Sequence, residues 1–176
     1  LIFRLVPAEQ WDLPFAPPAL SGLAYDGVLA SPHFTIKGEA FQHVGPTVWF
    51  GSRPHALPGG SVVEPDSYCG VESLARRLLA LGHRRIAFVC EHTRNPQYQD
   101  RLDAYRAFVA SHRLDACDPS ESVVGEDEAE AFVNLFRKSR RRPTAVMAAS
   151  DGVGCALVKA FQSAGIRVPD QVSVTG

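Results

Sequence analysis

The sequence predicts an α/β protein with a mainly parallel sheet. Short apolar runs rich in β-branched residues alternate with helical patterns along the whole chain of 176 residues, the order typical of βαβ units. Gly82 and Gly165 each end a helical pattern, and a strand-like run follows each of them. A turn-rich segment, RPHALPGG at 53–60, interrupts the alternation and is a candidate domain boundary.

The overall composition is that of an ordinary globular protein. Hydrophobic residues make up 45% of the chain, charged residues make up 21%, and the formal net charge is -1. This balance gives no electrostatic reason for the segment itself to bind nucleic acid or a membrane surface. No apolar run approaches the ~20 residues that a membrane span needs, and no charged and then apolar leader opens the chain.

The four cysteines show neither CxxC nor metal-finger spacing. Cys90 and Cys155 stand in apolar runs, where a small buried thiol is the expected arrangement. Scattered cysteines of this kind favour a reducing compartment over a disulfide framework, so we expect a cytoplasmic protein.

The first third of the chain contains strand-like runs at 1–6, 26–31 and 47–52. A short helix fits residues 18–23, and residues 61–63 form a short extended piece. The chain opens within the apolar run LIFRLV and closes on VSVTG, so both ends resemble interrupted strands. We therefore expect a piece of a longer protein.

The helical pattern that follows is very regular. Asp66 or Ser67 is the candidate N-cap, and Gly82 supplies the left-handed residue that ends the helix. The apolar residues recur at helical spacing: Val71, Leu74, Ala75, Leu78 and Leu79. The basic residues 83–85 then lie beside the negative end of the helix dipole, which favours a helix-terminating role over a nucleic-acid patch. The run KSRRRP at 138–143 has the same interpretation.

Further elements follow in the same rhythm. Strands are expected at 86–90, 122–124 and 144–150, and VSVTG begins another. Helices are expected at 97–112, after the second of these strands, and from about Asp151 to Gly165. The residues predicted to face inward are Leu102, Tyr105, Phe108, Val109, Ala129, Phe132, Val133, Phe136, Val153, Ala156, Leu157 and Ala160.

Candidate binding residues follow from strand polarity. In open parallel sheets, ligands bind outside the carboxyl ends of the strands. The polar residues at the carboxyl ends of the predicted strands include Ser31, His33, Ser52, His92, Ser150 and Asp151. Capping alone explains a short polar residue such as Ser150 or Asp151 before a helix, although a capped helix start also offers free N–H groups to a ligand.

Arg101 is a further candidate because of its place in the helix 97–112. It lies near the helix start, where a positive charge opposes the dipole. This placement predicts another partner, either an acidic side chain or a ligand.

Motifs of common enzymes are absent from the sequence. It has no P-loop, no HExxH and no GxSxG, and DGVGCAL has Leu157 where a dinucleotide fingerprint needs its third glycine. The run CEH at 90–92 has no second cluster with matching metal-ligand spacing. We therefore expect no enzyme, no cofactor and no metal site.

Several motifs in order carry a family resemblance. DSYCGVESLARRLLALGHRRIAFV is followed by RLDAYRAF, by RPTAVMAASDGVGCALVKAFQSAGIRVP and by PDQVSVTG. From about Tyr25 to Gly176 the chain resembles the LacI/GalR family of bacterial transcription regulators. The resemblance implies two doubly wound parallel-sheet lobes of the periplasmic-binding-protein-like type I fold, incomplete at both ends, with an effector held between them. Residues 1–61 would belong to the N-terminal lobe and 62–176 to the C-terminal lobe.

The resemblance also implies partners and site residues. The partners are a small-molecule effector, a sugar or sugar derivative, and DNA, bound through a helix-turn-helix domain outside this chain; a homodimer is expected. Arg101 matches the arginine that grips effector hydroxyls, and Ser150 and Asp151 match an asparagine–aspartate pair, with serine replacing asparagine. Ser52 falls where an aspartate is common, and Ala104 replaces a glycine.

Two other functional classes stay open at this point. A solute-binding protein of an ABC transporter would use the same fold, and a signal peptide upstream would favour it over the regulator. A nucleotide-dependent α/β enzyme is a third hypothesis, which the missing phosphate-loop and catalytic motifs disfavour.

Overall fold

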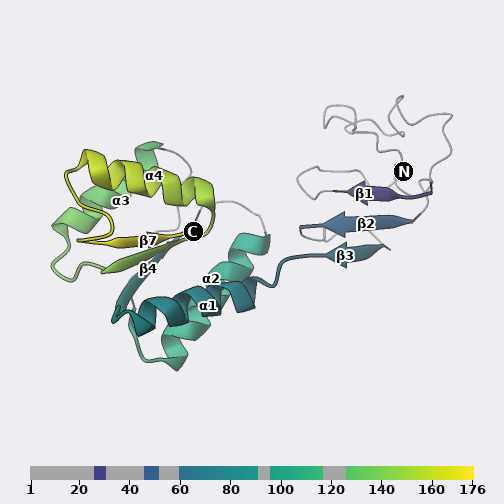
Figure 1. The fold of residues 1–176 in the computed structure, drawn as a ribbon, viewed down its shortest axis with the longest axis horizontal. Helices are drawn as coiled ribbons and strands as arrows, with labels where there is room; N and C mark the ends of the chain where they lie inside the picture. The colour runs from purple at the N-terminus through teal and green to yellow at the C-terminus, as the bar shows by residue number, and fades with distance from the viewer. Residues whose placement is uncertain (1–25, 31–45, 52–59, 91–95, 117–125) are drawn as a thin grey trace. The chain divides into compact units, whose positions relative to one another are not determined.

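The computed structural model describes residues 26–30, 46–51, 60–90, 96–116 and 126–176. The chain divides into two compact units, Leu1–Pro65 and Asp66–Gly176, and each has its own parallel sheet (Figure 1). The predicted α/β class with parallel sheets is therefore confirmed. The assignment of 1–61 and 62–176 to two lobes stays a prediction, and the elements expected at 1–6, 18–23 and 122–124 lie outside the described residues.

The first unit contains strands β1 (Val28–Ala30), β2 (Thr47–Phe50) and β3 (Ser61–Val63). They pair in the order β1-β2-β3, and both pairings are parallel. Gly60 leads into β3 with a φ of 92°, and a Cβ there would lie 2.8 Å from the Thr47 carbonyl oxygen. Only glycine combines this positive φ with such a close approach to β2.

The second unit contains a sheet of four parallel strands in the order β5-β4-β6-β7. These are β4 (Arg85–Val89), β5 (Asp115–Ala116), β6 (Ala145–Ala148) and β7 (Ser173–Thr175). The residues of β4 and β6 that are paired in register are buried on both faces, as expected of strands between two helical layers. Their continuous apolar sequences, IAFV and AVMA, are the reason for this double burial.

Two pairs of helices cover the two faces of this sheet (Figure 1). Helices α1 (Ser67–Ala80) and α2 (Pro96–Ser111) pack together on one face, in a core that contains Phe88 and Met147. Helices α3 (Glu126–Lys138) and α4 (Asp151–Ser163) pack on the other face, in a core that contains Val146 and Phe161. One parallel sheet with helices on both faces is the doubly wound arrangement.

Residues next to α1 in the sequence determine where this helix begins and ends. The Asp66 carboxylate accepts a hydrogen bond from the Cys69 N–H at 2.8 Å, so Asp66 is the N-cap. At the other end, Gly82 has a φ of 90°, and the His83 N–H returns to the Leu78 carbonyl at 3.0 Å. This is the glycine-ended helix that the sequence predicts.

Two local expectations need correction, and one strand was not expected. Leu74 is 36% exposed rather than inward-facing, because it lies at the margin of the buried stripe of α1. Cys155 is exposed, since it shares the outer side of α4 with Gly152 and Lys159 at helical spacing. The strand that follows α2 and pairs with β4 is β5 at 115–116, a two-residue strand that the polar sequence there does not predict.

The basic residues 83–85 have a more specific role than the predicted interaction with the helix dipole. His83 Nδ1 lies 3.0 Å from Thr144 Oγ1, and His83 Nε2 lies 3.2 Å from Ser173 Oγ. Arg85 Nε donates to the Arg142 carbonyl at 2.9 Å. These side chains therefore connect the amino ends of β4, β6 and β7.

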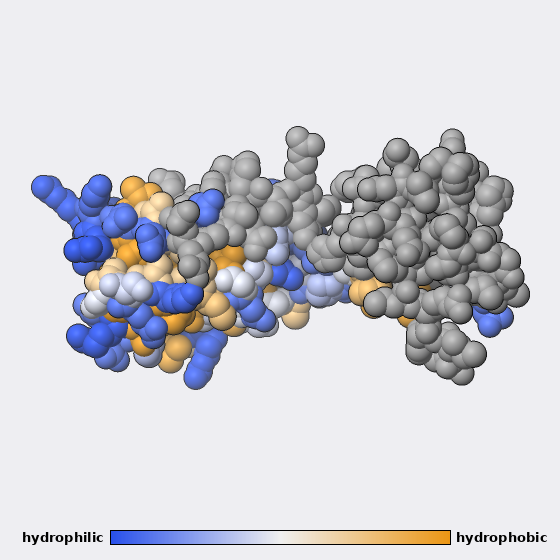
Figure 2. Space-filling model, turned by 90° about the horizontal axis from the view of Figure 1, so that it is seen from above, coloured by the Kyte–Doolittle hydropathy of each residue, from blue (hydrophilic) through white to orange (hydrophobic). Residues whose placement is uncertain are grey.

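The surface of the second unit mixes charged and apolar side chains, and Figure 2 shows hydrophilic side chains projecting around apolar ones. Its large exposed apolar side chains include Tyr68, Leu81 and Leu135. Among the described residues, no helix combines the length and the hydropathy needed to cross a membrane.

Candidate functional site

The candidate site in the second unit lies at the carboxyl ends of β4 and β6. The Ala149 N–H donates to the Val89 carbonyl at 2.8 Å, so the pairing of the two strands continues one residue beyond β6. The chain then turns directly into α4, whose first residue is Asp151. This short connection places Ser150 and Asp151 at the strand ends, where ligands bind in open parallel sheets.

Ser150 is the N-cap of α4. Its backbone is extended, and its hydroxyl oxygen accepts a hydrogen bond from the Val153 N–H at 3.4 Å. The cap occupies one lone pair and leaves the hydroxyl hydrogen available as a donor. Ser150 can therefore serve as a helix cap and as a ligand contact at the same time, so its capping role does not exclude a binding role.

Asp151 is exposed in the first turn of α4. A carboxylate at this place is stabilised by the positive end of the helix dipole. It offers acceptor oxygens only, which suit hydroxyl or amine donors of a ligand.

Arg101 extends from α2 to the end of β6. Its Nη1 donates to the carbonyl of Ala149, and its guanidinium lies 5.7 Å from the centre of the Tyr98 ring. Among the described residues, the partner of this arginine is thus a backbone carbonyl, and none of the described acidic side chains pairs with it. A guanidinium has five N–H donors, and its remaining N–H groups have no partner among the described residues.

The end of β7 packs against the same turn. A Cβ at Gly176 would lie 3.1 Å from the Ser150 carbonyl oxygen and 3.7 Å from the Asp151 Cα. A side chain at this position would crowd the start of α4. Glycine therefore allows the backbone after β7 to pack closely against the backbone of Ser150 and Asp151. Neither Gly176 nor the carbonyl of Ala149 was a predicted site component, because main-chain contacts of this kind leave no mark on local sequence.

The structure brings three of the predicted residues to one edge of the sheet. Arg101 bonds to the residue directly before Ser150 and Asp151, so all three lie at the carboxyl ends of β4 and β6. The other four candidates, Ser31, His33, Ser52 and His92, lie outside the described residues. Their roles stay predictions.

Comparison with known proteins assigns the fold to a family. Residues 75–176 match the family described as periplasmic binding protein-like domain. The chain belongs to this family. The HTH-type transcriptional regulator CelR of Thermobifida fusca is 30% identical to it over 164 residues, which cover 89% of this chain and 48% of that protein. The Ribose operon repressor of Haemophilus influenzae is 29% identical over 115 residues, covering 63% of this chain and 34% of the repressor.

Solved structures agree with this assignment. A putative LacI-family transcriptional regulator from Rhizobium etli matches with a TM-score of 0.70 and 29% identity, over 86% of this chain and 57% of that one. A LacI regulator from a Rhodococcus species matches with a TM-score of 0.72 at 22% identity, over 90% of this chain and 59% of that one, which shows the fold alone.

These comparisons confirm the predicted membership of the periplasmic-binding-protein-like effector-binding domains of LacI-type regulators. The relatives are named as transcriptional regulators rather than enzymes, in agreement with the expectation from sequence. The chain spans about half the length, or less, of the curated relatives it matches.

Proposed function

We propose that this chain is the effector-binding and dimerisation core of a LacI-type DNA-binding transcription regulator. A small molecule, a sugar or sugar derivative, would bind beside Arg101, Ser150 and Asp151 and change the affinity of the protein for its operator. A helix-turn-helix domain outside the chain would contact the DNA, and the protein would act in the cytoplasm as a homodimer. Family membership supports this proposal at the level of the domain.

The position of Arg101 is the observation that carries the proposal. Its guanidinium is held at the carboxyl ends of β4 and β6 by the Ala149 carbonyl and by the face of Tyr98, while its other N–H groups have no partner in the described part of the chain. A planar fork held in one orientation suits two adjacent oxygens, such as neighbouring hydroxyls of a saccharide. Preorganisation of this kind reduces the entropy lost when a ligand binds.

The neighbouring groups complement the arginine chemically. Asp151 offers acceptors, and Ser150 offers a donor hydrogen beside the start of α4. A sugar hydroxyl both donates and accepts, so it can use all three side chains. A sugar class is also supported by the name of the Ribose operon repressor among the relatives.

Ligand binding would act on DNA binding by differential affinity for two arrangements of the protein. A coupling free energy of ~1–3 kcal/mol between the two binding events is the usual scale for allostery. We expect a two-fold dimer, since the palindromic operators of such proteins mirror that symmetry.

The proposal is tested with Arg101 variants of the full-length protein. We expect a member of a saccharide panel to raise the melting temperature, and Arg101→Ala to abolish that shift because the fork is lost. Arg101→Lys retains the charge and one donor for the Ala149 carbonyl but lacks the fork, so it should also lose most of the shift. Differential scanning fluorimetry and calorimetric titration provide the measurements.

Arg106→Ala is the matched control, because Arg106 lies on the same helix and its guanidinium faces Asp103 at the surface. It should respond to the saccharide like the parent protein. If Arg101→Ala does so as well, the site assignment is wrong. A gel-shift assay separates the two remaining classes: a regulator releases or gains its operator with the ligand, whereas a solute-binding protein shows no operator complex.

A further inference from the structure

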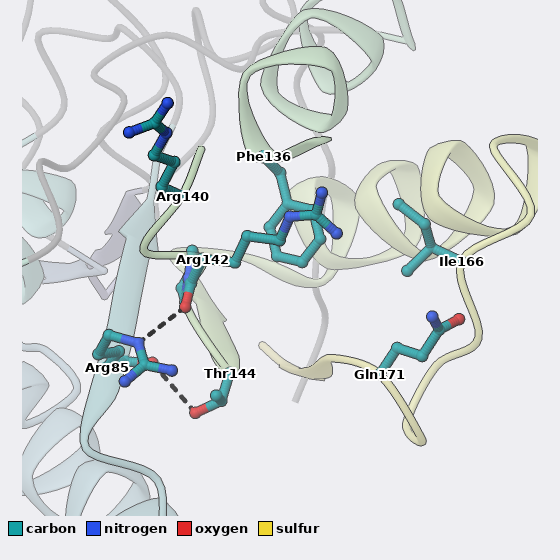
Figure 3. A pocket seen from close by; sticks show the side chains of 8 residues that line it. Arg85, Phe136, Arg140, Arg142, Thr144, Ile166 and Gln171 are labelled. Carbon is teal, nitrogen blue, oxygen red and sulfur yellow. Dashed lines mark hydrogen bonds between the residues drawn. The ribbon is translucent and has the colours of Figure 1, made fainter. Parts of the chain in front are cut away.

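A second group of polar side chains lies at the opposite end of the same sheet, where β4, β6 and β7 begin. A cavity of about 380 Å³ is lined there by residues next to all three strands, among them Arg85, Thr144 and Gln171 (Figure 3). Small-molecule sites occupy roughly 300–1,000 Å³, so this volume suits a small ligand. Since ligands of parallel sheets bind at the carboxyl ends, the family fold gives no reason for a cavity at this end.

The cavity has an apolar wall. Phe136 from the last turns of α3, Pro143 before β6 and Ile166 after α4 all line it. Figure 3 shows the Phe136 ring and the Ile166 side chain on either side of the hollow. A ligand that enters the cavity therefore meets hydrocarbon as well as charge.

Arg142 is held in place over this wall. Its Nη2 donates to the Arg137 carbonyl at 2.7 Å, its Nε donates to the Ser139 carbonyl at 3.4 Å, and its guanidinium lies 5.6 Å from the centre of the Phe136 ring. These contacts fix the plane of the fork and leave Nη1 without a partner among the described residues. The side chain thus presents a preoriented donor at the cavity.

The other polar groups of the cavity present donors too. Arg85 donates through Nε to the Arg142 carbonyl, and neither of its Nη groups has a partner among the residues that the structure describes. The oxygen Oε1 of Gln171 accepts a hydrogen bond from the Arg167 N–H at 2.8 Å. The NH₂ group of the same amide is therefore the end that can donate to a ligand. Arg140 lines the cavity and makes no hydrogen bond or ion pair with the described residues. In Figure 3 its guanidinium points away from Arg85 and Arg142. Arg140 is exposed, so the proposed site requires its side chain to adopt another rotamer when a ligand binds.

The charge balance favours an anion. The three arginines of the lining face no acidic lining residue. Two described acidic residues next to the cavity are engaged in other ion pairs: Asp115 pairs with Arg141 at 2.9 Å, and Asp170 pairs with Arg167 at 3.1 Å. The carboxyl end of α3 contributes only about half a negative charge here, and Arg142 already covers two of its carbonyls.

We infer that this cavity, lined by Arg85, Phe136, Arg140, Arg142, Ile166 and Gln171, is a second ligand site, separate from the proposed effector site. Its ligand is a small molecule that carries an oxyanion, a phosphate or a carboxylate, on an apolar or planar body. The oxyanion accepts hydrogen bonds from the free N–H groups of the arginines and from the Gln171 amide. The body lies against Phe136, Pro143 and Ile166.

Phenyl phosphate is the probe for this site, with the full-length protein observed by saturation-transfer NMR of the phenyl protons. We expect saturation of phenyl phosphate and of benzoate, weakening of both by inorganic phosphate, and no saturation of benzyl alcohol, which lacks the charge. The double variant Arg140→Gln/Arg142→Gln should lower the affinity by about tenfold or more, because each loses a charge-assisted hydrogen bond. Arg140→Gln alone gives a smaller decrease and removes no contact among the described residues, so folding is not at issue.

Arg141→Gln is the matched control, since it makes the same charge change in the same loop but does not line the cavity. Equal weakening by Arg140→Gln and Arg141→Gln would show general attraction between charges and would overturn the inference. So would loss of binding in Arg101→Lys, which would place phenyl phosphate at the carboxyl ends of the strands. Displacement of phenyl phosphate by a short duplex without operator sequence would reassign this face to polyanion binding.

Discussion

His83 illustrates how one side chain joins elements that are far apart in sequence. Its two ring nitrogens lie within hydrogen-bond distance of Thr144 before β6 and Ser173 at the start of β7. The Thr144 hydroxyl also donates to the Arg85 carbonyl at 3.3 Å, so its one hydrogen is committed there. His83 Nδ1 is then the donor to Thr144, and Nε2 accepts from the Ser173 hydroxyl in the neutral ring.

We expect His83→Ala to lower the free energy of unfolding by about 1–3 kcal/mol, since two hydrogen bonds at ~0.5–1.5 kcal/mol each are lost. Urea denaturation of the full-length protein measures this change. A double-mutant cycle with Ser173→Ala isolates one bond, because the His83 substitution should cost less once the Ser173 hydroxyl is gone. Full additivity of the two substitutions would show that the bond contributes nothing to stability.

Three arginines, like His83, form hydrogen bonds with residues far away in the sequence or in a neighbouring element. Arg85 is anchored by the Arg142 carbonyl before β6, Arg142 by carbonyls at the carboxyl end of α3, and Arg101 by the Ala149 carbonyl after β6. In the described part of the chain, each anchor leaves other N–H groups of the guanidinium without a partner. Both proposed ligand sites depend on this combination of a fixed plane and free donors.

At the scale of the elements, the helices are delimited by local chemistry. Asp66 and Ser150 cap α1 and α4 through side-chain oxygens, and glycines with positive φ follow both helices. Aromatic contacts then fix how α3 and α4 pack. The Phe161 ring meets the Phe136 ring edge-on at 5.1 Å and the Phe132 ring edge-on at 6.2 Å. Such edge-to-face pairs add stability beyond the buried area.

Replacing the cap of α1 tests this description. Asp66→Ala should lower the free energy of unfolding by about 1 kcal/mol, because the Cys69 N–H loses its acceptor. Chemical denaturation followed by far-UV circular dichroism measures the change. Glu64→Ala removes an exposed carboxylate just before α1 and should change stability by less than about 0.5 kcal/mol. Equal effects of the two substitutions would assign the loss to charge rather than to capping.

At the scale of the whole molecule, the central strands of the second unit are the most protected part of the described chain. β4 and β6 pair with each other, each has a further strand on its other side, and helices cover both faces. Local opening of these strands requires loss of both helical layers. β5 has two residues and a single partner strand among the described elements.

We therefore expect the amides of 86–89 and 146–148 to exchange slowest with deuterium in the native protein. Their exchange should approach the rate set by global unfolding, whereas residues 115–116 should exchange through local fluctuations. Hydrogen-exchange mass spectrometry with short peptic fragments resolves these segments. Comparable exchange rates in β4 and β5 would contradict this hierarchy.

Several elements of the second unit were predictable to within a few residues. IAFVC, TAVMAAS and VSVTG predicted β4, β6 and β7, and Gly82 and Gly165 end the preceding helical patterns. Two predictions of burial were wrong: Leu74 stands at the border of the buried stripe, and Cys155 faces outward from an apolar run. No pattern in the sequence indicated β5, which pairs through its backbone despite a polar sequence.

The sequence by itself determined the α/β class with parallel strands, the glycine ends of α1 and α4, the candidate caps of these two helices, and the family. Each depends on periodicity or on contacts within a few residues. It also selected Arg101, Ser150 and Asp151 by their positions relative to the strands. Only the tertiary structure decided what these residues meet: Arg101 reaches a carbonyl 48 residues away, and Arg85 reaches one 57 residues away. Such contacts arise because folding brings strand ends together, and no local pattern specifies which carbonyl or ring will lie within reach of a side chain.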